Sequence, residues 1–382
     1  MNNVYLNGLG NVSPQKTIRG ISTNGNGVAT LLDEPIFFET NQFKCPDPGY
    51  KDFIPGDMIR RMGRIIKMGV TASKLCLRDA ATGRNADSVQ EIIPDAIITG
   101  TGLGCMEDTE KFLTSMIRNN EEFLTPTSFI QSTHNTVAGQ IALLLKCHGY
   151  NFTYVHRGIS FESALTDAMI QLQLGEFSNA LVGGSDELTA NSFAITSRLG
   201  YWKQKPVHPM NLLDDPQRGT IAGEGASFFF LENQKNQQTY AGLAGVATFL
   251  KPSSSLEVSE RLQTFLASHG LTIADISLVV LGLSGDPRTD QVYHALVKSD
   301  FQNSPLAFFK HLCGEYHTAT AFATWLAAMM IKTQSVPEVV RVKGLHGQIM
   351  PGKNRQDATI EYVLIYNHYR ENNHAFILLS RP

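Results

Sequence analysis

Apolar residues along this chain alternate between short continuous runs and a helical repeat. Short runs rich in β-branched and aromatic residues predict strands, and apolar residues that recur every three or four positions predict helices. The predicted strands are 4–10, 94–104, 152–155, 179–182, 227–231, 276–282, 306–309, 360–366 and 375–379. The predicted helices are 59–80, 107–118, 135–145, 160–174, 256–268 and 318–332, and 126–130 is predicted to be extended. The pattern is that of an α/β protein.

The most informative stretch runs from residue 151 to 188 and predicts a strand, a sharp turn, a buried helix and a second strand. The strand at 152–155 is expected to be largely buried. Gly158 is expected to supply a backbone geometry that most residues resist, and Ser160 to cap the helix. A turn at the positive end of a helix suits a nucleophile or an acyl oxygen. From this stretch alone, a tightly packed crossover without chemistry is the favoured interpretation.

The alternation of strands and helices occurs before and after residues 233–255. Residues 233–240 and 251–255 have the most linker-like composition in the chain. This order predicts an α/β duplication with parallel strands and right-handed crossovers, divided into halves at 1–240 and 241–382.

Composition narrows the class of protein. The 382 residues are 42% hydrophobic and 18% charged, as in globular proteins, and a net charge of −3 gives no argument for nucleic acid or a membrane surface. No apolar run reaches the roughly 18 residues of a membrane helix, and MNNVYLNGLG lacks the features of a signal peptide. Five cysteines without a CxxC pair indicate reduced thiols in a cytoplasmic protein. No metal site and no cofactor are expected, because no ligand or nucleotide-binding spacing is present.

Five segments in order resemble those of the β-ketoacyl synthases. They are RRMGRIIKMGVTASKLCLRDA, IITGTGLGCMEDTEKF, ALVGGSDE, RGTIAGEGASFFFLE and KHLCGEYHTATAFA. The resemblance implies a thiolase-like, five-layered αβαβα duplicated fold. It also implies a tight dimer and acyl chains delivered on an acyl carrier protein.

The resemblance also shows where this chain departs from the family. A Cys nucleophile and two His residues carry the family's chemistry, and the corresponding positions here hold Gly158, Gly282 and Glu315. Lys310 of the last motif is kept, and His317 lies two residues beyond Glu315. Glycine cannot hold an acyl group, and a carboxylate would repel both a malonyl carboxylate and an oxyanion. The family's glycine loop near the C-terminus is replaced by residues 368–371, with Tyr369 at the place of a gating Phe.

The leading hypothesis is therefore a non-condensing homologue of fatty acid or polyketide-type biosynthesis, similar to a chain length factor. Its expected partners are an acyl carrier protein and a ketosynthase, in a homodimer or heterodimer. The first alternative is an acyltransferase in which Ser160, His156, Lys310, Glu315 and His317 converge in one pocket, with His156 and Tyr369 as substrate-binding residues. A structural ion pair between Glu315 and His317 is at least as good an interpretation of those two residues. The second alternative is an active ketosynthase with a displaced nucleophile at Cys313 or Cys105.

Overall fold

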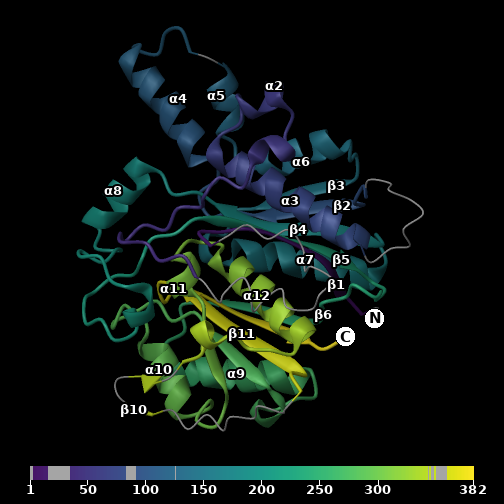
Figure 1. The fold of residues 1–382 in the computed structure, drawn as a ribbon, viewed down its shortest axis with the longest axis vertical. Helices are drawn as coiled ribbons and strands as arrows, with labels where there is room; N and C mark the ends of the chain where they lie inside the picture. The colour runs from purple at the N-terminus through teal and green to yellow at the C-terminus, as the bar shows by residue number, and fades with distance from the viewer. Residues whose placement is uncertain are drawn as a thin grey trace.

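The computed structural model describes residues 3–15, 35–82, 92–124, 126–342 and 359–382, and only the backbone at 344–345 and 348–349. Ten strands form one sheet in the order β3-β2-β4-β5-β1-β6-β12-β11-β7-β8 (Figure 1). They are β1 (Tyr5–Val12), β2 (Ala96–Gly100), β3 (Tyr150–Tyr154), β4 (Asn179–Asp186), β5 (Gly225–Glu232), β6 (Ala241–Leu250), β7 (Leu278–Leu281), β8 (Leu306–Phe308), β11 (Tyr362–Tyr369) and β12 (Asn373–Ser380). A separate short pair joins β9 (Gly344–Leu345) to β10 (Gln348–Ile349).

The strand order repeats itself, which confirms the predicted duplication. From its outer edge inward the first half runs β3-β2-β4-β5-β1, and the second half runs β8-β7-β11-β12-β6 in the same relative order. The halves meet where β1 and β6 pair antiparallel at Tyr5–Gly242 and Leu6–Ala241. The expected parallel strands occur at β3-β2-β4 and at β8-β7-β11, whereas β5 and β12 run antiparallel to their neighbours. In the second half this follows from the tight hairpin between β11 and β12, which leaves no room for a crossover.

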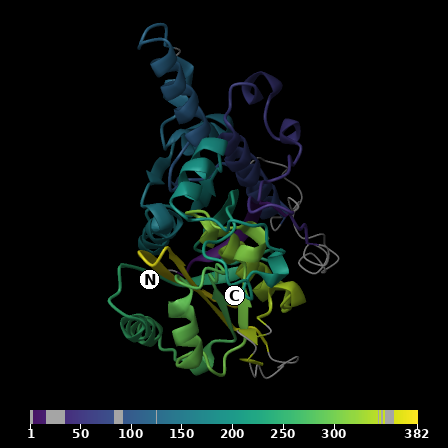
Figure 2. The same ribbon diagram turned by 90° about the vertical axis from the view of Figure 1, so that its left-hand side faces the viewer.

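Helices divide the molecule into five layers, as Figures 1 and 2 show. Helices α3 (Arg64–Thr82) and α6 (Thr136–Leu145) pack on one outer face, and α9 (Ser255–Ser268) and α10 (Gln291–Lys298) pack on the other. Helices α7 (Ser160–Leu174) and α12 (Ala319–Thr333) share a central core with strands of both halves. That central position explains why α12 is apolar nearly all round. The fold is the thiolase-like αβαβα arrangement.

The remaining helical segments lie at the surface or in connections. They are α2 (Gly56–Ile59), α4 (Met106–Arg118), α5 (Pro126–Gln131), α8 (Ala190–Arg198), α11 (Lys310–Cys313), η1 (Tyr50–Asp52), η2 (Arg157–Ile159), η3 (Pro209–Asn211), η4 (Ile273–Asp275) and η5 (Glu338–Val340). Within the part of the chain that the structure describes, no helix combines the length and apolarity that crossing a bilayer requires.

Several predicted elements differ from the structure. The extended segment predicted at 126–130 is helix α5, which starts on Pro126 and packs Phe129 against Phe112 of α4 with ring centroids 5.3 Å apart. The helix predicted from residue 59 begins at Arg64, after the separate short helix α2. The pattern did not predict β6, α8 or α10, because the runs of apolar residues in these elements are short or interrupted.

The strand that precedes the central turn is also exposed rather than buried. β3 lies at the edge of the sheet and pairs only with β2, so one long side of the strand has no neighbour among the described residues. Phe152 on this strand is 45% exposed, and its neighbours Tyr150 and Val155 are similarly exposed. Apolar residues predict a strand equally well at an edge and in the interior, so the sequence could not separate the two.

Candidate functional site

Gly158, which the resemblance aligns with the nucleophile position, lies in the turn between β3 and α7, and another residue occupies the space beside it. A Cβ added to Gly158 would lie 2.1 Å from Tyr369 Cβ and 2.8 Å from Tyr369 Cγ, far closer than packed carbon atoms approach. The left-handed backbone expected at Gly158 belongs instead to its neighbour Arg157, with φ of 52°. Gly158 is therefore required by the close approach of Tyr369 and not by its own backbone conformation.

Ser160 and His156 are not arranged as a nucleophile and base. The buried Ser160 hydroxyl donates to the Arg157 carbonyl (2.7 Å) and accepts from the His156 backbone N–H (2.8 Å), so it fastens the turn. It does not cap α7, contrary to the expectation from sequence. The His156 ring is exposed, and its Nδ1 lies 2.9 Å from Ser163 Oγ instead of contacting Ser160. A serine that already donates its proton to a carbonyl is poorly placed to attack an acyl group.

Two polar side chains lie against Gly282, which the resemblance aligns with the first histidine. A Cβ on Gly282 would lie 2.0 Å from Asn367 Oδ1 and 2.7 Å from the Tyr293 hydroxyl. Asn367 Nδ2 in turn donates to Thr320 Oγ1 of α12 at 2.7 Å, and the Tyr293 hydroxyl accepts from the His368 backbone N–H at 2.9 Å. A side chain at residue 282 would therefore require the Asn367 and Tyr293 side chains to move and to give up these hydrogen bonds.

Glu315, which the resemblance aligns with the second histidine, forms a buried ion pair. Lys310 Nζ lies 2.6 Å from Glu315 Oε2, and the two side chains are 0% and 6% exposed. Burial raises the pKa of Glu315, and the adjacent ammonium opposes that rise. Removing one member of such a pair typically costs about 3–5 kcal/mol, because the other charge stays buried alone. The predicted ion pair between Glu315 and His317 is therefore wrong in its partner, which is Lys310.

His317 packs on an aromatic ring. It stacks on Tyr369 with ring centroids 4.3 Å apart, and burial lowers the pKa of its imidazole while the Asp186 carboxylate opposes that effect. Asp186 accepts hydrogen bonds from the backbone and hydroxyl of Thr318 and from the backbone of Gly102. The His317 ring is therefore buried and packed against Tyr369. Of the five residues predicted to converge, the structure joins the side chains of Lys310 and Glu315, whereas His317 stacks on Tyr369.

The two cysteines considered as displaced nucleophiles are poorly suited to that role. All five cysteines are buried and free of disulfides. Burial raises the pKa of the Cys313 thiol well above its ordinary value, and it also raises the pKa of the Cys105 thiol. A neutral buried thiol is a weak nucleophile.

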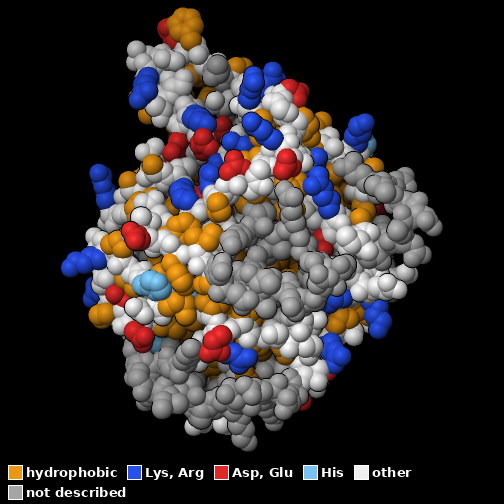
Figure 3. Space-filling model, viewed as in Figure 1, with side chains coloured by type: hydrophobic (Ala, Val, Ile, Leu, Met, Phe, Trp, Pro, Cys, Tyr) orange, Lys and Arg blue, Asp and Glu red, His pale blue; other side chains and the backbone are white. Residues whose placement is uncertain are grey.

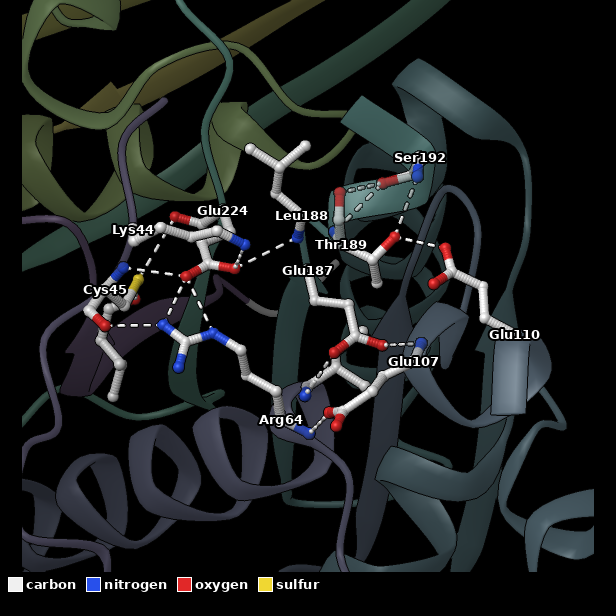
Figure 4. A network of polar contacts seen from close by, with 12 residues as sticks. Lys44, Cys45, Arg64, Glu107, Glu110, Glu187, Leu188, Thr189, Ser192 and Glu224 are labelled. Carbon is white, nitrogen blue, oxygen red and sulfur yellow. Dashed lines mark hydrogen bonds and ion pairs between the residues drawn. The ribbon is translucent and has the colours of Figure 1, made fainter. Parts of the chain in front are cut away.

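A network of carboxylates beside the site holds its scaffold together (Figure 4). Buried Glu224 accepts from Arg64 Nε at 2.9 Å, from the Cys45 backbone at 2.9 Å and from the Leu188 backbone at 3.1 Å. It thereby ties the segment before α2 and the start of α3 to the end of β4. Glu224 lies in the GEGA part of the family-like segment, and in this chain it stabilises the fold by accepting these hydrogen bonds.

The residues missed by sequence reasoning are those that fill the vacated positions. Asn367 and Tyr293 lie against Gly282, and buried Glu162 of α7 interacts with Thr320 and Lys310. A polar residue in an apolar helix repeat was the available signal for Glu162. The other two carry no local signal, because their role depends on contacts between distant segments. Among the described residues, no group of three or more His, Cys, Asp or Glu is arranged to hold a metal.

Comparisons with known proteins agree on the fold. Three solved structures each match 100% of this chain: a β-ketoacyl synthase from Burkholderia phymatum (TM-score 0.78, 20% identity, 100% of that chain), the ishigamide ketosynthase/chain length factor (0.76, 20%, 99%), and a ketosynthase in complex with its chain length factor from Xenorhabdus doucetiae (0.73, 15%, 98%). At these identities the likeness demonstrates a shared fold.

The sequence itself identifies the family. A search of curated proteins finds no match. The family model of the β-ketoacyl synthase N-terminal domain matches residues 37–237, more than half of the chain. This chain belongs to the β-ketoacyl synthase family.

Proposed function

We propose that this chain is a non-condensing member of its family, which pairs with an active ketosynthase and helps to form the acyl chamber, as a chain length factor does. The observation that supports the proposal is that all three expected catalytic positions are substituted, and that other groups occupy the space at the two glycines. Tyr369 fills the space at Gly158, Asn367 that at Gly282, and Lys310 neutralises Glu315. A chain without a thiol or imidazole at these places can neither hold the acyl group nor stabilise the oxyanion of condensation.

Its exposed apolar surface supports a protein partner. Helix α4 projects from the rest of the molecule (Figures 1 and 2), and the segment that follows it exposes Phe123 to 89%. The other exposed apolar residues of this arm are Leu113, Ile117, Phe129 and Ile130. Edge strand β3 adds a row of backbone groups that pair with no second strand among the described residues, beside the exposed Phe152. A partner strand that pairs with β3 would cover this edge, as in β-sheet augmentation.

A carrier protein is the second proposed partner. One solved structure that resembles this chain in fold contains a type II acyl carrier protein in complex with its ketosynthase. Lys and Arg side chains lie over α2 and α3 in Figure 3, with Asp and Glu side chains among them, and Arg60 and Arg61 are exposed at the end of α2. Such a surface attracts an acidic carrier domain and would guide it toward the paired subunits.

The first experiment tests the chemistry. The purified chain is incubated with acyl-loaded carrier protein and its intact mass is measured, with an active ketosynthase as the positive control. We expect no acyl adduct on this chain and a stoichiometric one on the control. A stoichiometric acyl group on this chain would refute the proposal.

The second experiment tests the pairing. The chain is co-expressed with a ketosynthase that carries the Cys-His-His set, and the recovered complex is measured by size-exclusion chromatography. Phe152→Asp and Ile117→Asp should each weaken the complex strongly, because a charge is then buried at the interface. Leu256→Asp is the matched control, since Leu256 is 67% exposed on α9, at the opposite end of the molecule from α4. A stable assembly of this chain with itself, in the presence of the ketosynthase, would count against the proposal.

A further inference from the structure

A series of contacts fills the region where the family's acyl group would bind. At one end a Cβ on Gly102, which follows β2, would lie 2.1 Å from His317 Cγ. His317 stacks on Tyr369, and at the other end a Cβ on Gly158 would lie 2.1 Å from Tyr369 Cβ. Two rings therefore lie between two glycines, and each ring fits because the residue against it has no side chain.

The hairpin tip that carries Tyr369 is anchored on both sides. The guanidinium carbon of Arg370 lies 3.3 Å from the centroid of the Tyr201 ring, and the Asn372 carbonyl accepts from the Lys251 backbone N–H at 2.9 Å. Arg370 and Glu371 both have left-handed backbones, with φ of 53° and 56°, where the family has a glycine loop. Non-glycine residues in this region cost conformational energy, which the surrounding contacts offset. The tip is thus held in one place, and Tyr369 with it.

We propose that Tyr369 is a fixed plug that excludes both acyl groups and side chains from position 158, so that residues 158 and 369 can carry side chains only one at a time. This proposal rests on the proposed non-condensing function. It explains the loss of the acyl acceptor by the packing of Tyr369 against residue 158. Restoring a cysteine at residue 158 is then insufficient to restore an acyl acceptor, because the thiol and Tyr369 compete for one space.

The experiment places Gly158→Ala in three backgrounds: the native chain, Tyr369→Ala and Tyr369→Gly. Tyr369→Ala removes the ring but keeps the Cβ that conflicts at 2.1 Å, whereas Tyr369→Gly removes both. We expect Gly158→Ala to raise the unfolding equilibrium constant by about tenfold or more in the first two backgrounds, in line with overpacked cores, and far less with Tyr369→Gly. Gly139→Ala on α6, where nothing lies within 4 Å of the added Cβ, is the control in each background.

The outcomes separate clearly. A penalty of equal size in all three backgrounds overturns the proposal, and so does failure of Gly158→Ala to fold in all three. Failure in the native and Tyr369→Ala backgrounds, with recovery in Tyr369→Gly, supports it.

A thiol probe gives a second readout. With Gly158→Cys, iodoacetamide should label residue 158 readily in the folded Tyr369→Gly chain and not in the otherwise native chain, whose own five cysteines are buried. Equal labelling in the two folded proteins overturns the proposal. Neither measurement uses a carrier protein or a partner subunit, so a failure here is distinct from a failure of the proposed function.

Discussion

At the scale of single residues, the buried acid Glu162 makes the stability of the fold depend on pH. It lies on α7 at the centre of the molecule and is fully buried, and among the described residues its carboxylate receives only weak contacts, from its own backbone and from Thr320. Burial raises the pKa of Glu162 to about 7, although Thr320 and Lys310 lower it in part. An acid whose pKa is higher in the folded chain stabilises the fold when protonated.

This predicts a specific pH dependence. The stabilising contribution of Glu162 is fully present below its unfolded pKa of about 4.5 and is lost as the pH rises through about 7. Relative to native, Glu162→Gln should gain up to about 3 kcal/mol of stability between pH 4.5 and 8. Urea unfolding of both proteins across this pH range measures the difference in their free energies of unfolding. The other buried acids contribute equally to both proteins, so their effect drops out of this difference. A difference that does not change with pH would contradict the prediction.

At the scale of elements, Glu187 joins the N-termini of two helices. One carboxylate oxygen accepts from the Ile65 N–H at the start of α3 (3.1 Å), and the other accepts from the Glu107 N–H at the start of α4 (2.8 Å). Helix N-termini carry unsatisfied donors and a partial positive charge, which a carboxylate complements. The same residue follows β4, so it positions the projecting helix α4 relative to the sheet.

We expect Glu187→Ala to lower the free energy of unfolding by about 2 kcal/mol or more, since two buried donors lose their acceptor. Hydrogen exchange at the Ile65 and Glu107 amides should become faster in this variant through local opening of the two helix N-termini, without global unfolding. The control is Glu361→Ala, which removes an exposed ion pair with Arg381 and should change stability little. Unchanged protection of both amides in Glu187→Ala would show that the carboxylate does not hold these helices.

At the scale of the molecule, the two halves share one interior. The central cluster includes Phe161 and Leu165 of α7 together with Phe322 and Leu326 of α12, and it takes strands from both halves. By contrast, the direct strand pairing between β1 and β6 covers only two residue pairs. The halves are therefore held together by burial of the central helices more than by the sheet.

This arrangement predicts how the halves behave when separated. Neither fragment 1–240 nor fragment 241–382 should fold alone, because each would expose its central helix, and the two should associate when co-expressed. Circular dichroism and size-exclusion chromatography check both statements. Cooperative thermal unfolding of either fragment alone would contradict the prediction and would make the halves independent domains.

The sequence by itself determined the parts of this protein that depend on local pattern. Apolar spacing located most helices and strands, the repeated order indicated a duplication, and five motif-like segments pointed to the family. The absence of Cys and His at Gly158, Gly282 and Glu315 was also visible, because it requires only an alignment of positions. Where local pattern fits two environments, as for β3 and 126–130, the sequence predicted the wrong one.

Only the tertiary structure decided what replaced the catalytic groups. Tyr369 lies against Gly158, Asn367 against Gly282, and Lys310 against Glu315. The first two contacts join residues 211 and 85 positions apart, and nothing in the spacing along the chain encodes such contacts. A missing side chain is a property of the sequence, whereas the group that fills its space is set by how distant segments pack.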